Sequence, residues 1–533
     1  MKRWNGWGNI QTENPPSAHT LEFLQQVLGP GTSQQSLSFE EACAKVPDSR
    51  LTESPLWDTR RETRVRYARG QSLPDLIATR TGLELHFPDG VAFPQSTEEV
   101  ETLVQEALQN GWTLIPYGGG TSVAGHINPP MQEKPVLTVS LERMNRLLSV
   151  DTESHLARFQ AGVRGVDLEA QLRAHGFTLG HFPQSFEYST LGGWIVTRSS
   201  GQQSLRYGRI EQLFAGGLAV TPQGRWELPP LPASAAGMDL RQLLLGSEGR
   251  LGILTEATVR ITPLPEQEVF HAAFLPDWQQ AMQCVRELVQ KRIPLSMLRL
   301  STPRETEANL IMAGKPRAVQ ALKKLLSVKG IGDFRCMLLY GMTGTKPEVR
   351  HLKGQVQRVL QKHGGMDTGT LLGKGWQHNR FRAPYLRNHL WEHGHAIDTL
   401  ETCTTWERLE DTRLGIEEAL QNALRDENEK VFAFTHLSHL YPSGSSLYTT
   451  YAFRIDPDPE VTLQRWKKLK SAASRAIVQH GATISHQHGV GRDHAPYLPP
   501  EKGNIGMKLM HTVVDHLDPQ RIFPEGVLLP EEV

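Results

Sequence analysis

The most informative stretch of this 533-residue sequence is a glycine-rich run, Pro116-Tyr117-Gly118-Gly119-Gly120-Thr121-Ser122. It follows a short apolar segment, Thr113-Leu114-Ile115, which we expect to form a strand. Consecutive glycines let backbone N–H groups approach an anion without interference from a Cβ atom, and the two hydroxyl residues add donors. The run therefore suits a pyrophosphate, although an ordinary strand-to-loop turn can use the same residues. It matches neither the P-loop nor the G-x-G-x-x-G motif.

A predicted helix before this strand indicates an α/β domain. Ser96 can cap free backbone N–H groups of the helix while Glu99 reaches back to Ser96, as in a capping box. Apolar residues recur at helical spacing from Val100 to Leu108, and Gly111 stands where a C-terminal cap is expected. With another strand expected at 135–139, the pattern predicts a crossover connection.

Two further glycine-rich clusters follow in the same region. The second, at 184–193 and running on to 197–201, combines small hydroxyl residues, paired glycines and one arginine. The third, at 246–254, is a turn that leads into an alternating apolar and polar strand at 251–262. Each cluster alone is compatible with simple turn chemistry. Together, three clusters in this order and spacing indicate one binding site for a cofactor.

Composition excludes several classes of protein. The chain has 57 Lys+Arg and 57 Asp+Glu residues and no basic run, which argues against nucleic acid as a partner. With 38% hydrophobic and 21% charged residues, the composition is neither that of a disordered chain nor that of a membrane-embedded one. The amino terminus lacks the apolar run of a signal peptide, so we expect a cytoplasmic enzyme. Four cysteines lie far apart without a C-x-x-C pair, which favours neither disulfides nor a zinc cluster: Cys43, Cys284, Cys336 and Cys403.

The chain divides into four predicted parts. Residues 1–80 form an irregular and helical N-terminal segment, punctuated by prolines and glycines. We place a cofactor-binding domain at 81–266, because two prolines end the alternating strand near residue 266. Residues 267–480 mix helices with strands and form a second domain. Residues 481–533 form a C-terminal segment that ends with a helix.

Two histidines stand out in the C-terminal segment, in the run Ser485-His486-Gln487-His488-Gly489-Val490-Gly491-Arg492. Imidazole titrates near neutral pH and can therefore move a proton at low cost. The same pattern is also compatible with a surface pair or with a metal site. We expect no metal, because no nearby carboxylate or thiolate completes a ligand set.

Three further side chains in the second domain are candidates for a functional role. Tyr448 lies in a predicted strand rich in Tyr and Thr, where packing alone can explain an aromatic residue. Arg387 would ordinarily lie on a solvated helix face, but a guanidinium is the natural bidentate partner of a phosphate. Arg299 interrupts an apolar run, and a buried charge at that position needs a partner.

These elements together resemble the FAD-binding domain of the vanillyl-alcohol-oxidase type of flavoprotein, and within that type the chain is most similar to the alkylglycerone-phosphate (alkyl-dihydroxyacetone-phosphate) synthases. The similarity includes Trp4-Asn5-Gly6-Trp7-Gly8, residues 183–190 and Tyr207-Gly208-Arg209-Ile210-Glu211. It ends at 518–523 and so covers nearly the whole chain. The resemblance implies an α+β fold: a two-subdomain FAD-binding domain plus an α/β cap (substrate) domain built on an antiparallel sheet.

The resemblance also implies which residues contact FAD. The family holds FAD non-covalently, and His126, just past the first glycine run, makes no strong case for a covalent link. The expected cofactor contacts are Pro116, Tyr117, Gly118, Gly119, Gly120, Thr121, Ser122, Gln184, Ser185, Phe186, Glu187, Tyr188, Ser189, Thr190, Thr197, Arg198, Ser199, Ser200, Glu248, Gly249, Arg250, Leu251, Gly252, Ile253 and Leu254.

The family's functional residues fall on the candidates already described. Its substrate-binding arginine falls on Arg387, and its active-site tyrosine falls on Tyr448, for which the resemblance implies a role in proton transfer. Another arginine that is important for activity falls on Arg299. The resemblance therefore implies that these three side chains serve one site.

The family's run of three histidines falls on His486, Gln487 and His488, so the central histidine is replaced here. Glutamine forms hydrogen bonds but cannot move a proton near neutral pH, which leaves two activities open. One exchanges the acyl group of acylglycerone phosphate for a long-chain alcohol, as in ether lipid synthesis. The alternative is an FAD-linked dehydrogenase or oxidase of a 2-hydroxy acid or polyol. A non-catalytic flavin- or lipid-binding protein ranks below both, because the His, Tyr and Arg set is largely intact.

The expected substrates also bear on location. A long-chain alcohol sits in membrane, so we expect peripheral contact with a membrane surface as well as a cytoplasmic location. The sequence shows no strongly basic amphipathic segment that would mark the contact. A homodimer is left open.

Overall fold

The helix–strand unit before the first glycine run forms as predicted. In the computed structural model, which describes residues 2–530, α5 (Thr97–Asn110) leads into β3 (Thr113–Tyr117). The Ser96 hydroxyl accepts a hydrogen bond from the Glu99 N–H at 3.3 Å, and Gly111 ends the helix with a φ of 69°. The Glu99 carboxylate accepts from the Gln95 N–H at 2.8 Å rather than from Ser96, so the predicted capping box is wrong in that one contact.

Strand β3 belongs to a four-stranded sheet of order β1-β2-β4-β3. Strands β2, β4 and β3 are parallel, as a crossover connection requires, and β1 pairs antiparallel with β2 at the edge. The other strands of this sheet are β1 (Trp57–Asp58), β2 (Gly90–Ala92) and β4 (Val136–Ser140).

An antiparallel five-stranded sheet of order β5-β6-β10-β8-β9 completes the first half of the molecule. The predicted alternating strand is β10 (Ile253–Arg260), at the centre. One hydrophobic core spans both sheets and includes Leu103, Phe159 and Trp194, so the sheets are two subdomains of one domain. The remaining strands are β5 (Leu147–Asp151), β6 (Leu156–Gln160), β8 (Phe214–Thr221) and β9 (Gly224–Leu228), with β7 (Phe177–Thr178) and β11 (Thr262–Pro263) as a separate pair.

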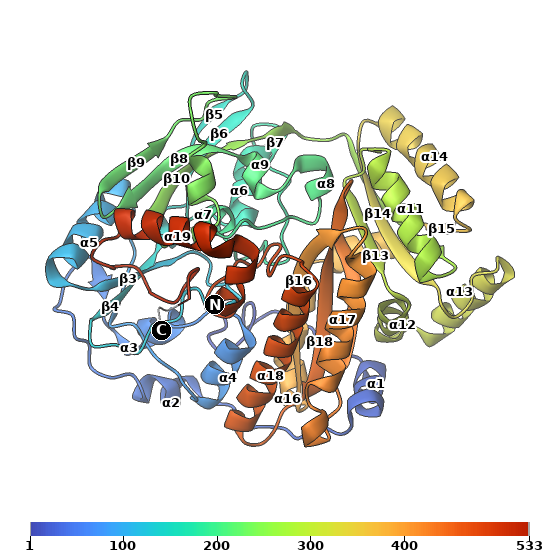
Figure 1. Cartoon of the computed structure of the whole chain (residues 1–533), viewed down its shortest axis with the longest axis horizontal. Helices are drawn as coiled ribbons and strands as arrows, with labels where there is room; N and C mark the ends of the chain where they lie inside the picture. Colours follow the sequence, from blue (N-terminus) through green and yellow to red (C-terminus); the bar gives the residue numbers. More distant parts are fainter. Residues whose placement is uncertain (1, 531–533) are drawn as a thin grey trace.

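The second half is a cap built on a seven-stranded antiparallel sheet of order β15-β12-β14-β13-β17-β18-β16. One face packs against α11 (Trp278–Gln290), α14 (Lys346–Lys362), α17 (Leu409–Asn422) and α18 (Pro459–Gln479) (Figure 1). The predicted α+β fold, a two-subdomain domain plus a cap on an antiparallel sheet, is confirmed. The strands are β12 (Gln267–Leu275), β13 (Met297–Ser301), β14 (Cys336–Gly344), β15 (Met366–Gly369), β16 (His395–Thr405), β17 (Phe432–Tyr441) and β18 (Gly444–Arg454).

The other face of the cap sheet is partly apolar and packs against further helices, but it also carries a group of polar side chains. Side chains alternate between the faces of a strand, so Arg299, Glu401, His436 and Tyr448 lie opposite the four large helices. The strand register sets Tyr448 directly between Glu401 and His436. This arrangement gathers charged and titratable groups on one side of the cap.

The two ends of the chain tie the halves together. Helix α4 (Leu73–Thr81) packs on α18, and α1 (Ala18–Leu28) packs on α12 (Pro303–Met312). Helix α19 (Pro499–Leu517) lies across the first half (Figure 1), and the Leu114 N–H donates to the Ile522 carbonyl at 2.7 Å. Residues 531–533 of the predicted C-terminal segment lie outside the described residues, and the predicted boundaries near 80, 266 and 480 stay predictions. The other helices are α2 (Phe39–Ala44), α3 (Arg61–Arg66), α6 (Gly165–Arg173), α7 (Leu191–Val196), α8 (Ser204–Tyr207), α9 (Ile210–Leu213), α10 (Arg241–Leu244), α13 (Pro316–Val328), α15 (Leu371–Asn379) and α16 (Leu386–Glu392).

Candidate active site

The first two predicted cofactor clusters lie in direct contact. A Cβ atom at Gly119 would collide with the Tyr188 carbonyl oxygen, so only glycine permits this approach. Within residues 2–530, no group accepts a hydrogen bond from the backbone N–H groups of 118–122. Unpaired N–H groups along such a turn form a cradle for an anion. The residues present therefore fit the pyrophosphate of FAD.

The third predicted cluster holds the histidine-containing loop. The Glu248 carboxylate accepts hydrogen bonds from the backbone N–H groups of Val490 and Gly491, the latter at 2.7 Å. It also lies 3.2 Å from Nε2 of His126, whose Nδ1 lies 2.6 Å from the Ser122 hydroxyl. Both ring nitrogens of His126 are thus engaged by the protein. The absence of a covalent link to FAD stays a prediction.

Three predicted cofactor residues commit their side chains to the protein. The Arg198 guanidinium donates to the Leu245 carbonyl at 3.1 Å, and the Arg250 guanidinium donates to the Phe523 carbonyl at 2.5 Å. The Phe186 ring packs on two other phenylalanines. Any contact that these residues make with FAD is therefore expected from their backbones. The roles of the other predicted cofactor residues likewise stay predictions.

A buried carboxylate, Glu401 on β16, organises the histidine-containing loop. It accepts hydrogen bonds from the Ser485 hydroxyl at 2.9 Å, and from the N–H groups of His486, Gln487 and His488 at 2.7, 3.1 and 2.9 Å. These loop contacts, apart from that of Ser485, use backbone donors that nearly any residue supplies. The replacement of histidine by Gln487 is therefore compatible with the same loop shape. The Gln487 Oε1 atom is buried and has no hydrogen-bond partner among residues 2–530.

His486 is fixed by two further side chains. Its Nε2 lies 2.6 Å from the Tyr441 hydroxyl and also contacts the Arg209 guanidinium, which donates to the His486 carbonyl at 2.8 Å. Burial, the neighbouring His439 and the Arg209 cation hold the pKa of His486 well below its usual range. An imidazole that is neutral and accepts at Nε2 carries its proton on Nδ1. His486 is therefore a neutral imidazole, and its contacts with Tyr441 and Arg209 keep the ring in one orientation.

Tyr448 lies between two imidazoles. Its ring stacks on His436 at 4.9 Å between centroids and meets the His488 ring edge-on at 5.9 Å. Its hydroxyl donates to the Thr399 hydroxyl at 3.2 Å. Burial raises the pKa of Tyr448 and lowers the pKa of His488. At neutral pH the pair is a protonated phenol beside a neutral imidazole, that is, a proton donor beside a proton acceptor.

Arg299, a charged residue in an apolar run, is paired with Glu305. Its Nη2 donates to the Glu305 carboxylate at 2.7 Å, and His436 Nδ1 lies 3.0 Å from the same oxygen. Burial opposes ionisation of Glu305, but His436 and Arg299 outweigh it and lower the pKa of Glu305 to about 2. Arg299 thus supports the ring on which Tyr448 stacks. The structure brings four predicted residues into one cluster: Arg299, Tyr448, His486 and His488.

Among residues 2–530, no hydrogen bond links the predicted substrate-binding residue to this cluster. Arg387, on α16, donates through Nη1 to the Gln71 carbonyl at 2.7 Å. Its Nε and Nη2 atoms are buried and have no hydrogen-bond partner among residues 2–530. Unpaired guanidinium donors in a buried position suit a phosphate, which forms bidentate hydrogen bonds.

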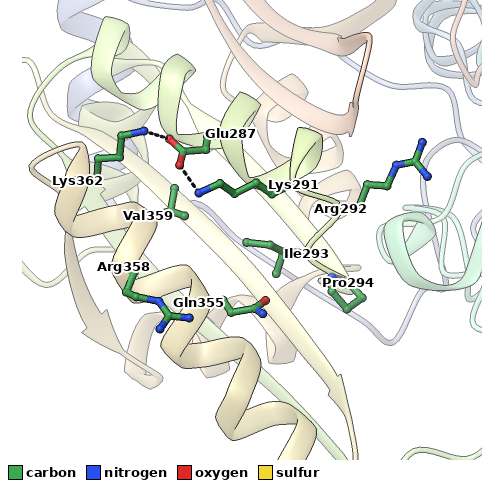
Figure 2. Close-up of a pocket in the computed structure, with 9 residues that line it drawn as sticks. All are labelled: Glu287, Lys291, Arg292, Ile293, Pro294, Gln355, Arg358, Val359 and Lys362. Carbon is green, nitrogen blue, oxygen red and sulfur yellow. Dashed lines mark hydrogen bonds and ion pairs between the residues drawn. The ribbon is translucent and has the colours of Figure 1, made fainter.

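A surface pocket between α11 and α14 is unrelated to this site (Figure 2). Its lining includes Glu287, whose carboxylate pairs with Lys291 at 2.6 Å and Lys362 at 2.7 Å. Hydrogen bonds from these lysines and His363 lower the pKa of Glu287 to about 2. The pocket holds none of the predicted site residues, and its carboxylate is already neutralised.

The sequence interpretation missed Glu401, Arg209, Tyr441 and Glu305. Glu401 lies in a strand of mainly apolar and threonine residues that also contains Asp398, so the argument from buried charge that singled out Arg299 applies to it as well. Arg209 lies in the run 207–211 that carries the resemblance, but nothing in that run indicates a contact with His486, and Tyr441 lies in no motif. Among residues 2–530, no group of three or more His, Cys, Asp or Glu side chains is arranged to hold a metal ion.

Comparisons with known proteins agree with this architecture. Residues 88–227 match a family model described as an FAD binding domain, and residues 264–527 match one described as FAD linked oxidases, C-terminal domain. An alkyldihydroxyacetonephosphate synthase of Dictyostelium discoideum is 32% identical over 88% of this chain and 77% of its own length. One of Trypanosoma brucei brucei is 30% identical over 99% of this chain and 92% of its own length.

Solved structures show the same relationship. A structure of an alkyldihydroxyacetonephosphate synthase covers 100% of this chain and 99% of its own, with a TM-score of 0.85 and 27% identity. A p-cresol methylhydroxylase structure, at 14% identity and a TM-score of 0.68, covers 96% of both chains and shares the fold. The cofactor is FAD, as predicted. The chain belongs to the alkyldihydroxyacetonephosphate synthase family of FAD-dependent enzymes.

Proposed function

We propose that this enzyme exchanges the acyl group of acylglycerone phosphate for a long-chain alcohol. The bond between the glycerone carbon and the ester oxygen breaks, and the fatty acid leaves as a carboxylate with the bonding pair. The alcohol oxygen forms the new ether bond while its proton passes to the protein. The exchange involves no net oxidation or reduction. FAD, when bound, supplies the electron-rich ring that this chemistry uses in the family.

The protein's own residues handle the protons. A proton is lost from the carbon between the ester and the ketone and is returned to that carbon in the product, so the net release is the one proton of the alcohol. Tyr448 transfers protons through its phenolic oxygen, and neutral His488 beside it accepts them. His486 is held rigid by Arg209 and Tyr441 and keeps this loop aligned. The paired phenol and neutral imidazole carry the proposal, because an exchange of protons near neutral pH needs both forms.

Charge in the substrate is met by Arg387. Arg387 offers two unpaired donors in a buried position, which suits the substrate phosphate. Arg299 is already paired with Glu305, so it acts through the His436 ring rather than as a free cation. Gln487 lies on a loop whose N–H groups at 486–488 bind Glu401, and its Oε1 atom has no partner among residues 2–530, which leaves it for a hydrogen bond to substrate.

The direct test uses purified flavin-loaded protein, palmitoylglycerone phosphate and isotope-labelled hexadecanol. Mass spectrometry of the products is expected to show labelled ether together with free palmitate. Their formation would also show that the exchange tolerates Gln487. Intact substrate in the presence of bound FAD would overturn the proposal. The next measurement would then be flavin bleaching by 2-hydroxy acids and polyols, which the alternative dehydrogenase activity predicts.

We also propose that the enzyme contacts membrane peripherally, because its alcohol substrate partitions into lipid. Of the helices in residues 2–530, none combines the length and apolarity needed to cross a bilayer. Helix α13 lies at the outer tip of the cap (Figure 1), and it and the turn after it expose Leu325, Val328 and Phe334 at 50%, 82% and 76%. The exposed Lys324 and Lys329 beside them suit an anionic surface.

Sedimentation with phosphatidylcholine vesicles, with and without phosphatidylserine, tests this contact. Replacing the three apolar residues with serine is expected to abolish binding. Ile505→Ser removes an equally apolar side chain, 86% exposed on α19, and serves as the control. Equal binding by all three proteins would rule out α13 as the contact. The cytoplasmic location and the homodimer stay predictions.

A further inference from the structure

The N-terminal loop, residues 2–9, contacts both the first and the second of the three predicted cofactor clusters. Lys2 and Asn9 pair as an isolated antiparallel bridge, which closes the loop. The Lys2 ammonium donates to the Gly119 carbonyl at 2.8 Å, and the Asn9 amide donates to the Tyr188 hydroxyl at 3.2 Å. Both ends of the loop are therefore anchored in the first half of the molecule.

The middle of the loop binds the cap through one side chain. The Trp7 N–H donates to Oδ1 of Asn388 at 2.9 Å, and Nδ2 of Asn388 donates to the Trp7 carbonyl at 3.0 Å. The amide of Asn388 thus pairs with the Trp7 peptide as a neighbouring strand would. Asn388 is 2% exposed, so no water replaces these two hydrogen bonds if they are lost.

The shape of the loop matches helix α16 closely. Gly8 has a φ of +86°, and a Cβ atom at this position would collide with the ring of Tyr385, the residue before α16. Only glycine combines this backbone conformation with this contact. This contact therefore fixes the position of the loop relative to α16.

Both groups that fix Arg387 touch the N-terminal loop. Asn388 is its neighbour on α16, and Gln71 supplies the carbonyl that accepts from its Nη1. The Gln71 side chain donates in turn to the Gly6 carbonyl at 3.3 Å, and its N–H donates to the Ser122 carbonyl at 2.6 Å. The loop thus connects the guanidinium to the first glycine run.

We propose that the N-terminal loop sets the position of Arg387 for a phosphate group, and that Asn388 is the positioning residue through which it acts. The identity of the phosphate ester rests on the proposed function. Bidentate recognition needs both donors of the guanidinium aligned, so a small rotation of α16 weakens phosphate binding without touching the reacting atoms. The loop therefore controls selectivity for a phosphorylated substrate.

The test compares Asn388→Leu with wild type as flavin-loaded full-length chains. Leucine keeps the size of the side chain and removes both hydrogen bonds. KM for palmitoylglycerone phosphate is expected to rise by about tenfold or more, with kcat within about threefold. For the same ester without its phosphate, kcat/KM is expected to stay unchanged. A loss shared equally by the two esters would indicate a merely structural role and overturn the proposal.

A binding experiment separates this inference from the proposed function. Calorimetric titration of flavin-loaded protein with glycerone phosphate needs no turnover, and Asn388→Leu is expected to bind it about tenfold more weakly. Unchanged affinity would overturn the inference even if wild type makes ether. Gly8→Ala attacks the same contact from the loop side and is expected to act in the same direction.

Asn14→Ala is the matched control. Its amide donates to the Arg382 carbonyl at 3.2 Å, so it also links the N-terminal segment to the cap, but it contacts neither Arg387 nor Gln71. We expect wild-type selectivity from this variant. An equal loss of selectivity in Asn14→Ala would show that any contact in this region has the effect, and would refute a specific role for Asn388.

Discussion

Tyr448 is the side chain on which the proposed exchange depends most. Tyr448→Phe removes one hydroxyl and keeps the ring that stacks on His436. Ether formation is expected to fall by about a hundredfold or more, because proton transfer loses its donor. Flavin absorbance is expected to stay at the wild-type level. Mass spectrometry of the ether product checks the rate, and a retained rate would remove Tyr448 from the proton transfer.

Glu305 links stability to pH at the same site. Its folded pKa of about 2 lies below the usual value of 4.5, so its ion pair with Arg299 stabilises the protein above pH 4.5 and is lost as the pH falls toward 2. Glu305→Gln leaves Arg299 and His436 without their carboxylate and is expected to cost about 3 kcal/mol at pH 7.

Thermal unfolding of wild type and Glu305→Gln at several pH values measures this cost. The difference between the unfolding midpoints of wild type and Glu305→Gln is expected to be largest at pH 7. It is expected to narrow once the pH falls below 4.5. A gap that stays constant or widens in acid would mean that Glu305 is not ionised in the folded protein.

At the scale of elements, the histidine-containing loop has its shape because a carboxylate binds it from each half of the molecule. Glu401 of the cap accepts from residues 485–488, and Glu248 of the first half accepts from Val490 and Gly491. Glu401→Gln replaces one acceptor oxygen with an NH2 group that faces other donors. We expect a loss of roughly 2–4 kcal/mol in stability together with a loss of ether formation.

Glu501→Gln is the control for this change. Glu501 accepts from the Ile484 N–H at 3.0 Å and from the Thr483 hydroxyl at 3.0 Å, just before the loop, but its side chain is 29% exposed. Its loss is expected to lower the unfolding midpoint less and to spare activity. Equal effects of the two substitutions would indicate that Glu401 has no special part in the loop.

The glycine runs and the histidine pair could be predicted because their chemistry is local. Three glycines in a row or two imidazoles two residues apart are visible in one short stretch of sequence. Glu401, Arg209 and Tyr441 act on backbone groups and rings that lie far away in the chain, and such contacts leave no spacing to detect. The strand register that sets Tyr448 between Glu401 and His436 is likewise a property of the folded sheet.

At the scale of the whole molecule, the C-terminal tail holds the first half together. The Asp518 carboxylate is fully buried and accepts from the N–H groups of Ile522 and Phe523 at 2.8 and 3.0 Å. Asp518→Ala frees this turn and leaves two buried N–H groups unpaired, at a cost of about 1–3 kcal/mol for each group. We expect weaker flavin retention and a lower unfolding midpoint, which gel filtration with flavin absorbance and a thermal scan measure. Wild-type values for both would show that the tail is dispensable.

The hydrogen bond between Leu114 and Ile522 has a consequence for how the protein is made. Strand β3 leaves the ribosome early, but its edge partner is translated about 400 residues later, roughly 20–80 s at ordinary rates of synthesis. Until then the edge of β3, at the base of the first glycine run, lacks that bond. A ribosome-bound chain therefore lacks this contact at the edge of β3 until the C-terminal tail has been synthesised.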